Sequence, residues 1–278
     1  TTKSYDSTAD AKGKAIYSNT APAVVDQLSQ NLWIDTTPNE LRMLLNKTNI
    51  SLERGVTAVV GPNGGGKTTL FNVISGLIPL THGSLKIKGL SPEESQGVIG
   101  YVPQNENVNW NFSLTARQIV TMGLTKNNSF LPLTSKKDKA LIESSLDKVG
   151  LLDRIDDRVE EMSGGQRQRV FIAKTLAQGA EVLLLDEAFS GVDVGSQEDL
   201  INVLKKLRDD GKTILMATHD LNTLSDRFDE VLCLNRHCCA YGDPLQVFTP
   251  DVLQELYGSH RSMFENHALG NHGHQNGV

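Results

Sequence analysis

GPNGGGKTT, residues 61–69, is the stretch that decides the fold of this chain. From Gly61 to Thr68 it fits the pattern G-x-x-x-x-G-K-[ST], which is typical of a phosphate-binding loop. Glycines in such a loop allow successive backbone N–H groups to curl around phosphate oxygens at the positive end of a helix dipole. The stretch predicts a nucleotide site, with a glycine-rich turn that holds an exposed lysine as the alternative.

The residues on either side of this loop favour the nucleotide site. Val56 to Val60 form a β-branched apolar run typical of a buried strand, and LFNVISGL after the loop has the apolar spacing of a helix. In this setting Lys67 is predicted to bind the β- and γ-phosphates and the Thr68 hydroxyl to ligate Mg²⁺. The predicted nucleotide-binding residues of the loop are Gly61, Pro62, Asn63, Gly64, Gly65, Gly66, Lys67, Thr68 and Thr69.

Composition narrows the function only a little. The 278 residues and a formal charge of −6 suit one large or two small α/β units, and the acidic balance argues against nucleic acid as a partner. No apolar run reaches the ~18 residues that span a bilayer and no signal peptide is recognisable, so we expect a cytosolic chain. Cys233, Cys238 and Cys239 are expected to be thiols in that compartment.

The sequence predicts three parts. Residues 1–30 and 259–278 are polar, and we interpret them as an N-terminal extension and a His-containing tail. Residues 31–258 form the predicted domain, interrupted at about 104–163 by a helical insert whose clearest helix ends at Gly150 as its C-cap. Strands that alternate with helices predict an α/β fold with a parallel sheet. The expected strands span residues 32–34, 56–60, 84–87 and 98–102, and further strands lie in EVLLLDE (181–187), TILMATHD (213–220) and EVLCLN (230–235).

EVLLLDE, residues 181–187, joins a buried strand to two carboxylates. Open α/β sheets form their sites at the carboxyl ends of such strands. Asp186 is predicted to hold Mg²⁺, and Glu187 to orient and deprotonate an attacking water. The alternative is a strand end with two solvated acids, which the nearby phosphate loop makes less favoured.

Three further polar groups are candidates with plainer alternatives. MSGGQ, residues 162–166, contains a capping box that can simply begin a helix, although two successive glycines there indicate that something approaches the backbone closely. His219, after the strand TILMA, can donate to a γ-phosphate oxygen or be an ordinary hydrogen-bonded histidine. Gln104, at the end of GYVPQ, offers a carbonyl to Mg²⁺ or to the water, and alone it would carry no meaning.

Taken together, GPNGGGKTT, YVPQ, MSGGQ, LLLDE, GVD and ATHD occur in the order and spacing found in the ATP-binding subunit of ABC transporters. The chain resembles that family over about residues 31–258. The resemblance implies a phosphate-loop NTPase core with a mainly parallel sheet, an N-terminal antiparallel β part and an inserted α-helical subdomain. It also implies ATP and Mg²⁺ as cofactors, hydrolysis of ATP, and peripheral attachment at the cytoplasmic face of the cell membrane through a permease subunit.

The same resemblance assigns roles to single residues. Gln104 resembles the glutamine that couples the γ-phosphate to the helical subdomain, His219 the switch histidine, and Asp193 an aspartate at a dimer seam. In this family the MSGGQ loop contacts the ATP held by the other subunit of a head-to-tail dimer. The residues expected to do so are Ser163, Gly164, Gly165 and Gln166. The aromatic residue that stacks on adenine stays unassigned, because Trp33 lies within a strand pattern and Tyr17 lies far upstream.

A narrower resemblance, carried by NENVNWNFSLTARQIVTMGL, LCLNRHCCAYGDPLQVF and TPDVLQELYG, is to the subfamily that takes up manganese, zinc and chelated iron. It implies an extracytoplasmic metal-binding protein as an indirect partner, and Trp110 and Phe112 as anchors for the permease, with core packing as their alternative. An exporter, an importer of another solute and a non-transport ABC ATPase remain open alternatives. A phosphate-loop kinase or GTPase does not fit MSGGQ.

Two stretches of the sequence contain potential metal ligands. Four of the seven histidines lie in residues 259–278, but their irregular spacing favours a solvated tail. His237, Cys238 and Cys239 are adjacent, and the crowding of neighbouring ligands favours plain packing over a metal site.

Overall fold

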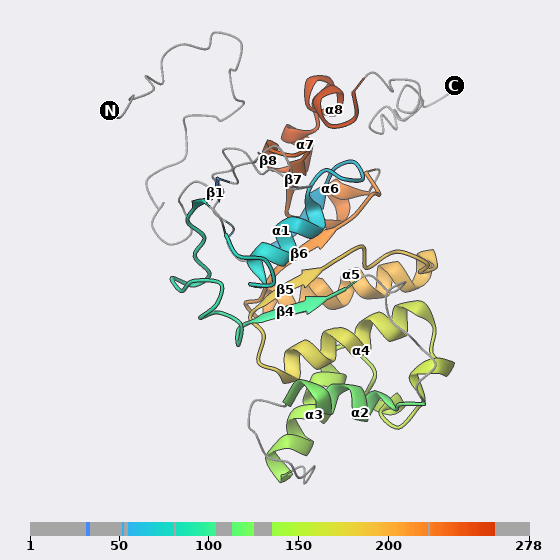
Figure 1. Cartoon of the computed structure of the whole chain (residues 1–278). Helices are drawn as coiled ribbons and strands as arrows, with labels where there is room; N and C mark the ends of the chain where they lie inside the picture. The colour runs from blue at the N-terminus through green and yellow to red at the C-terminus, as the bar shows by residue number, and fades with distance from the viewer. Residues whose placement is uncertain are drawn as a thin grey trace, which may run out of the picture.

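The computed structural model describes the central part of the chain, drawn in colour in Figure 1. The described residues are 32–33, 52, 55–80, 82–103, 113–124, 135–221 and 223–258. The predicted division at residues 30 and 258 therefore lies at the limits of what is described, and the boundaries of the helical insert stay a prediction.

A six-stranded sheet with the order β4-β5-β6-β2-β7-β8 forms the centre of the molecule. Its strands are β2 (Gly55–Val60), β4 (Ile99–Val102), β5 (Val182–Leu185), β6 (Thr213–Ala217), β7 (Glu230–Leu234) and β8 (Cys238–Gly242). All neighbours pair in parallel except β7 and β8, which are antiparallel. A second, two-stranded antiparallel sheet joins β1 (Leu32–Trp33) to β3 (His82–Gly83). The expected α/β fold with a mainly parallel sheet and an antiparallel β part is confirmed.

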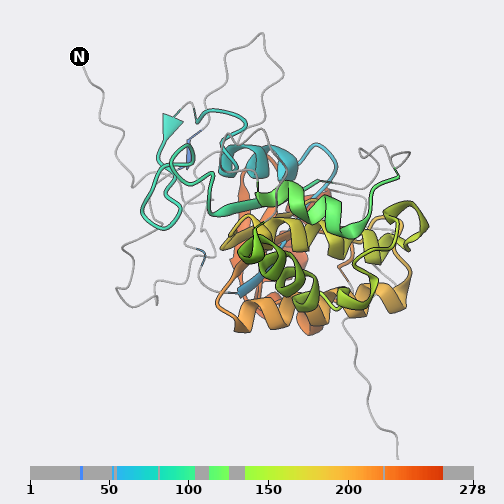
Figure 2. The same ribbon diagram turned by 90° about the horizontal axis from the view of Figure 1, so that it is seen from below.

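Helices cover both faces of the large sheet, so its strands are buried on both sides. α1 (Lys67–Ile74) lies on one face, and α4 (Gly164–Ala177) and α5 (Val194–Asp209) lie on the other (Figure 2). Side chains alternate between two apolar cores along the central parallel strands: in β5, Leu184 packs on the α1 side, whereas Leu183 and Leu185 pack on the α4 and α5 side.

The helical region packs on the sheet through α4. It contains α2 (Ala116–Thr121), a 3₁₀ turn (Met122–Leu124), α3 (Lys136–Lys148) and two more 3₁₀ turns (Leu152–Arg154 and Val159–Glu161). α2 and α3 lie at the bottom of Figure 1 against α4. α3 begins at a capping box on Ser135. Gly150, predicted as its C-cap, has a φ of 69° and lies one residue beyond the C-cap Val149.

The expected strand over residues 84–87 is wrong. Lys88 and Gly89 both have positive φ, 53° and 82°, and Ile87 and Leu90 exchange two backbone hydrogen bonds across them. Two successive positive φ values are the geometry of a type I′ turn, so the chain reverses at once. The strand that does form here, β3, lies two residues earlier.

The last described elements follow β7. β8 returns antiparallel beside it, and α7 (Pro244–Val247) and α8 (Pro250–Tyr257) follow β8. The short helix α6 (Leu224–Arg227) lies earlier in the chain, between β6 and β7. Figure 1 shows α7 and α8 at the end of the molecule away from α3. Among the helices that the structure describes, none has the length and apolar character needed to cross a membrane.

Candidate functional site

The phosphate loop joins β2 to α1 and is fixed by β7 and the turn after it. A Cβ on Gly61 would lie 1.9 Å from the backbone oxygen of Leu234, and one on Gly65 would lie 2.8 Å from the same atom. The backbone N–H of Arg236 donates a 2.8 Å hydrogen bond to the carbonyl of Gly65. These glycines are therefore required by a close approach of two backbone segments within the chain.

Lys67, the first residue of α1, folds back over the loop. Its Nζ donates to the carbonyl oxygens of Gly61 at 2.9 Å and Pro62 at 3.1 Å, and the side chain is buried. Burial lowers the pKa of Lys67 below its usual value, while Glu187 and Asp186 oppose that shift. The Lys67 ammonium is thus held by carbonyls of the phosphate loop itself, and its predicted contact with the β- and γ-phosphates stays a prediction.

Asp186 points to the α1 side of the sheet because it lies two residues beyond Leu184, which faces α1. Its Oδ2 accepts hydrogen bonds from Thr68 Oγ1 at 3.0 Å and from Tyr101 Oη at 3.2 Å. Burial raises the pKa of the Asp186 carboxyl, and the donated hydrogen bonds oppose the shift. A hydroxyl and a carboxylate at this spacing offer the hard oxygen ligands that Mg²⁺ prefers.

Glu187 follows in a left-handed backbone conformation, with a φ of 49°. Non-glycine residues adopt this conformation rarely, and it is concentrated at functional sites. Here it directs the carboxylate to the end of the neighbouring strand, where Glu187 Oε1 lies 2.6 Å from Nε2 of His219. Both residues line a pocket with Thr218 and Gln197. The two predicted catalytic residues, 32 positions apart in sequence, are thus in contact.

Ser163 caps α4 with a complete capping box: its Oγ accepts from Gln166 N at 3.3 Å, and Gln166 Oε1 accepts from Ser163 N at 3.0 Å. The two glycines after it have a reason within the chain. A Cβ on Gly164 would lie 3.2 Å from the carbonyl of Gly191, and one on Gly165 would lie 2.6 Å from Ser196 Cβ. The close approach that the glycines indicated is made by α5 and the loop before it, so the glycines alone do not require a partner.

Comparison with known proteins agrees with this geometry. A family model described as ABC transporter matches residues 45–190. The manganese transport system ATP-binding protein MntA of Synechocystis sp. PCC 6803 is 40% identical over 228 residues, which is 81% of this chain and 88% of that protein.

This chain belongs to the ABC transporter family. It is an ATP-binding subunit and an ATPase, as the sequence predicted.

Two further relatives of this ABC ATPase have different names. The zinc transport system ATP-binding protein TroB of Treponema pallidum is 37% identical, covering 73% of this chain and 76% of that protein. The chelated iron transport system membrane protein YfeB of Yersinia pestis is 38% identical, covering 81% and 77%. The resemblance to the manganese, zinc and chelated-iron subfamily is confirmed at the level of sequence.

Solved structures support the fold of this ABC ATPase. The ADP conformation of an ATP-binding cassette of an ABC transporter superposes with a TM-score of 0.70 at 23% identity, covering 83% of this chain and 98% of that one. A dimeric bacterial ABC transporter cassette superposes with a TM-score of 0.61 at 26% identity, covering 78% and 98%.

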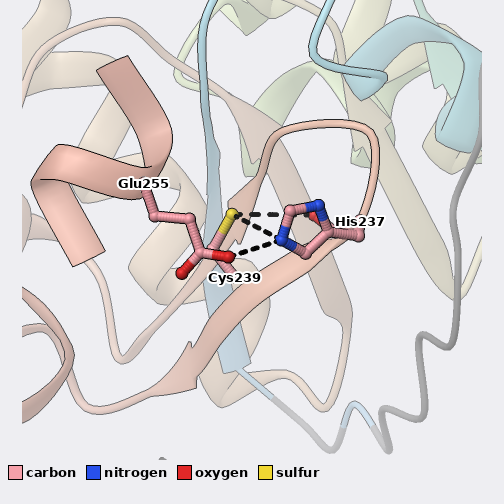
Figure 3. A group of neighbouring side chains, drawn as sticks. All are labelled: His237, Cys239 and Glu255. Atoms are coloured by element: carbon pink, nitrogen blue, oxygen red, sulfur yellow. Dashed lines mark hydrogen bonds and ion pairs between the residues drawn. The ribbon is translucent and has the colours of Figure 1, made fainter. Parts of the chain in front are cut away.

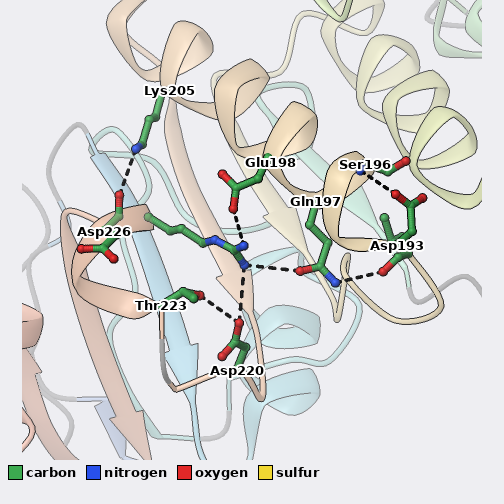
Figure 4. A network of polar contacts seen from close by, with 10 residues as sticks. Asp193, Ser196, Gln197, Glu198, Lys205, Asp220, Thr223 and Asp226 are labelled. Carbon is green, nitrogen blue, oxygen red and sulfur yellow. Dashed lines mark hydrogen bonds and ion pairs between the residues drawn. The ribbon is translucent and has the colours of Figure 1, made fainter. Parts of the chain in front are cut away.

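Arg227 is a member of the site that the sequence analysis missed. It lies on α6, is 8% exposed, and donates through Nη1 to Gln197 Oε1 at 3.3 Å and to Asp220 Oδ2 at 3.4 Å, and through Nη2 to Glu198. Gln197 Nε2 in turn donates to the carbonyl of Val192 at 2.9 Å. Figure 4 shows this network between α5 and the loop after β6. It ties the segment of Asp193, which caps α5, to the segment of His219.

We expect Arg227→Met in the ABC ATPase to lower the free energy of unfolding by about 2 kcal/mol, because partly buried acceptors lose a charged donor. Urea unfolding followed by circular dichroism measures the change. Lys205→Met is the matched control, since Lys205 donates to the exposed carbonyl of Asp226 and lies outside this network. Equal shifts in the two variants would contradict the role of the network. No sequence motif marks Arg227, because its partners lie 7 to 30 positions away.

Gln104, Trp110, Phe112 and the tail histidines lie outside the described residues, as do Tyr17 and the side chain of Trp33. Their predicted roles stay predictions.

Proposed function

We propose that this ATPase powers the uptake of a transition-metal ion (manganese, zinc or iron) through an integral membrane permease. The observation that carries the proposal is that relatives at 37–40% identity over most of the chain are named for manganese, zinc and chelated-iron transport. The chain would lie at the cytoplasmic face of the membrane, and an extracytoplasmic metal-binding protein would deliver the ion to the permease.

The proposed ATP site uses the residues around the phosphate loop. Backbone N–H groups of residues 61–69 and the ammonium of Lys67 would bind the phosphates. Thr68 Oγ1 and Asp186 Oδ2, 3.0 Å apart, would hold Mg²⁺, with Gln104 as a further predicted ligand. Bound Mg²⁺ would neutralise negative charge on the phosphates. Tyr101, which donates to the same carboxylate oxygen, would keep Asp186 oriented.

The proposed hydrolytic pair is Glu187 and His219. Glu187 would accept the proton of the attacking water, since a carboxylate within one water of a phosphate is suited to act as a general base. His219, in contact with Glu187 Oε1, would fix the carboxylate and donate to the γ-phosphate. The left-handed backbone of Glu187 supports this assignment, because it is what brings the carboxylate to His219.

A second copy of the chain is proposed to complete the site. The N-terminus of α4, with Ser163, Gly164, Gly165 and Gln166, would contact the γ-phosphate of ATP held by that copy. Two observations support a seam near Asp193: the neighbouring Val194 is an apolar side chain that is 71% exposed, and Ser163 is exposed. Closure of the head-to-tail dimer would then drive the permease.

One experiment tests the transported cargo. The gene is deleted in its host, and the manganese, zinc and iron contents of the cells are measured by mass spectrometry in metal-limited medium. Loss of one metal, restored by the wild-type chain and not by Glu187→Gln, supports uptake. A rise in metal content would indicate an exporter, and unchanged contents would indicate another solute or a non-transport role; either result overturns the proposal.

We expect Asp186→Asn to abolish hydrolysis while it stabilises the nucleotide-free protein. The pKa of Asp186 is raised on folding, so the unfolded chain gives up this proton first as the pH rises, and the ionised carboxyl then costs stability. The gain in Tm on substitution should therefore be present at pH 7 and disappear below the usual pKa of a carboxyl group. Calorimetry at the two pH values measures it. The exposed Asp147→Asn is the control, and an equal or opposite shift in Asp186→Asn would contradict the expectation.

A further inference from the structure

Three potential metal ligands converge at the end of the molecule that carries β8 and α8. His237 precedes β8, Cys239 lies in it, and Glu255 lies on α8 (Figure 3). His237 Nε2 is 2.6 Å from Glu255 Oε1 and 3.6 Å from Cys239 Sγ, and all three ligand atoms lie within 4.8 Å of one another. In the described part of the chain, this is the group of histidine, cysteine and acidic side chains that could hold a metal ion.

The local fold removes the reason for which the sequence analysis favoured plain packing at His237 and Cys239. Residues at positions i and i+2 of a strand project to the same face, so His237 and Cys239 converge while Cys238 points away into the core. Adjacent ligands would crowd one another, but these two are not adjacent. The third ligand comes from α8, 18 residues from His237 and held there by Asn235, whose Nδ2 donates to the carbonyls of Glu255 at 3.0 Å and Leu256 at 3.2 Å.

The spacing of these atoms is close to that of a tetrahedral zinc site. With Zn–N of ~2.0 Å, Zn–O of ~2.1 Å and Zn–S of ~2.3 Å, ligand atoms stand roughly 3.3–3.6 Å apart. The sulfur-to-nitrogen distance already agrees, and the nitrogen-to-oxygen hydrogen bond needs to open by roughly 0.7 Å. His237 and Glu255 can do so because their side chains are 41% and 48% exposed. The same exposure gives an ion a path to the site.

We propose that His237, Cys239 and Glu255 form a three-ligand site for a zinc-class divalent ion, and that its occupancy tightens nucleotide binding. Thiolate and imidazole ligands favour Zn²⁺ or Co²⁺ over Mn²⁺. The ion bound here is a regulator and is separate from the Mg²⁺ of the nucleotide site. The inference does not depend on which solute is transported.

A single residue, Arg236, connects the proposed metal site to the phosphate loop of the nucleotide site. Arg236, between Asn235 and His237, has a φ of 62° and donates its backbone N–H to Gly65 of the phosphate loop at 2.8 Å. An ion on His237 would join this strained turn to α8 and β8, and so restrain the segment that supports Gly65. A pre-organised loop loses less entropy when it binds phosphate, which raises affinity.

Titration of the full-length protein with Co²⁺ tests the site, with all thiols kept reduced. A thiolate-to-cobalt absorption band is expected in the wild type, and the tail histidines cannot imitate it because they carry no sulfur. The band should vanish in Cys239→Ser and persist in Cys238→Ala. His237→Ala and Glu255→Gln, at half-exposed positions, should weaken Co²⁺ and Zn²⁺ binding by at least about tenfold and keep the test valid if the cysteine variants fold poorly.

Absence of the band in the wild type, or the same band in Cys239→Ser, overturns the site.

The coupling between the metal site and nucleotide binding is tested by the affinity for a fluorescent ATP analogue with excess Mg²⁺, with and without one equivalent of Zn²⁺. Zn²⁺ should tighten binding several-fold in the wild type and have no effect in His237→Ala. An unchanged affinity in the metal-bound wild type overturns the coupling. Neither measurement involves transport, so these outcomes are distinct from failure of the proposed uptake function.

Discussion

The Glu187→Gln variant is expected to bind ATP as the wild type does and to hydrolyse it about 10²- to 10⁴-fold more slowly, which is the usual contribution of a general base. The amide has nearly the same shape as the carboxylate but cannot accept the proton of the attacking water. Binding should persist because Lys67, Thr68 and the loop are untouched. With hydrolysis blocked, ATP-bound dimers should accumulate.

Phosphate release measures the turnover of Glu187→Gln, equilibrium fluorescence measures ATP binding, and light scattering measures the dimer. Glu93→Gln is the matched control, since Glu93 is an exposed side chain in a turn before β4. Turnover within about twofold of the wild type would remove Glu187 from its assigned role. Loss of ATP binding together with turnover would point to damage of the loop instead.

Gly61→Ala is expected to give the largest loss of stability in the phosphate loop, about 3 kcal/mol. Its Cβ would meet the carbonyl oxygen of Leu234 at 1.9 Å. That oxygen cannot retreat easily, because β7 is paired with both β2 and β8. The carbonyl of Gly61 also holds Lys67, so the displaced loop should lose ATP affinity as well.

Gly55→Ala, at the other end of β2, is the control for Gly61→Ala. There the new Cβ would lie 3.5 Å from Asp229, an ordinary contact, and we expect a change within about 0.5 kcal/mol. Urea midpoints and ATP titrations of both variants measure the difference. Similar urea midpoints for Gly61→Ala and Gly55→Ala would show that the phosphate loop can accommodate a Cβ at position 61 despite the 1.9 Å contact.

The sequence predicted an element best where the physical cause of that element lies in residues that are close together in the chain. The run of Val56 to Val60, the capping box of Ser163 and the Gly150 cap each depend on neighbours in the chain, and each forms as predicted. The strand expected over residues 84–87 failed because β propensity gave no warning of the positive φ values at Lys88 and Gly89. The turn at Lys88 and Gly89 therefore prevailed over the apolar pattern of residues 84–87.

The contacts that complete the candidate site could not be predicted in the same way. Glu187 and His219 meet because β5 and β6 pair side by side in the sheet. Arg227 meets its acceptors because α6 lies beside α5 and the loop after β6. The antiparallel strand β8 was not expected, and without it His237 and Cys239 have no common face. Motifs indicated which side chains carry chemistry, whereas strand order determined which of them touch.

Because side chains along β5 alternate between the two cores, the position of Asp186 in the sequence decides which side of the sheet its carboxyl faces. Leu184 and Asp186 share the α1 side, and the Thr68 hydroxyl can donate to Asp186 only because one residue separates that carboxyl from Leu184. A single residue inserted between Leu184 and Asp186 would rotate the carboxyl to the opposite side of the sheet, toward α4 and α5 and away from Thr68. Insertions of one residue should therefore be excluded from this segment during evolution.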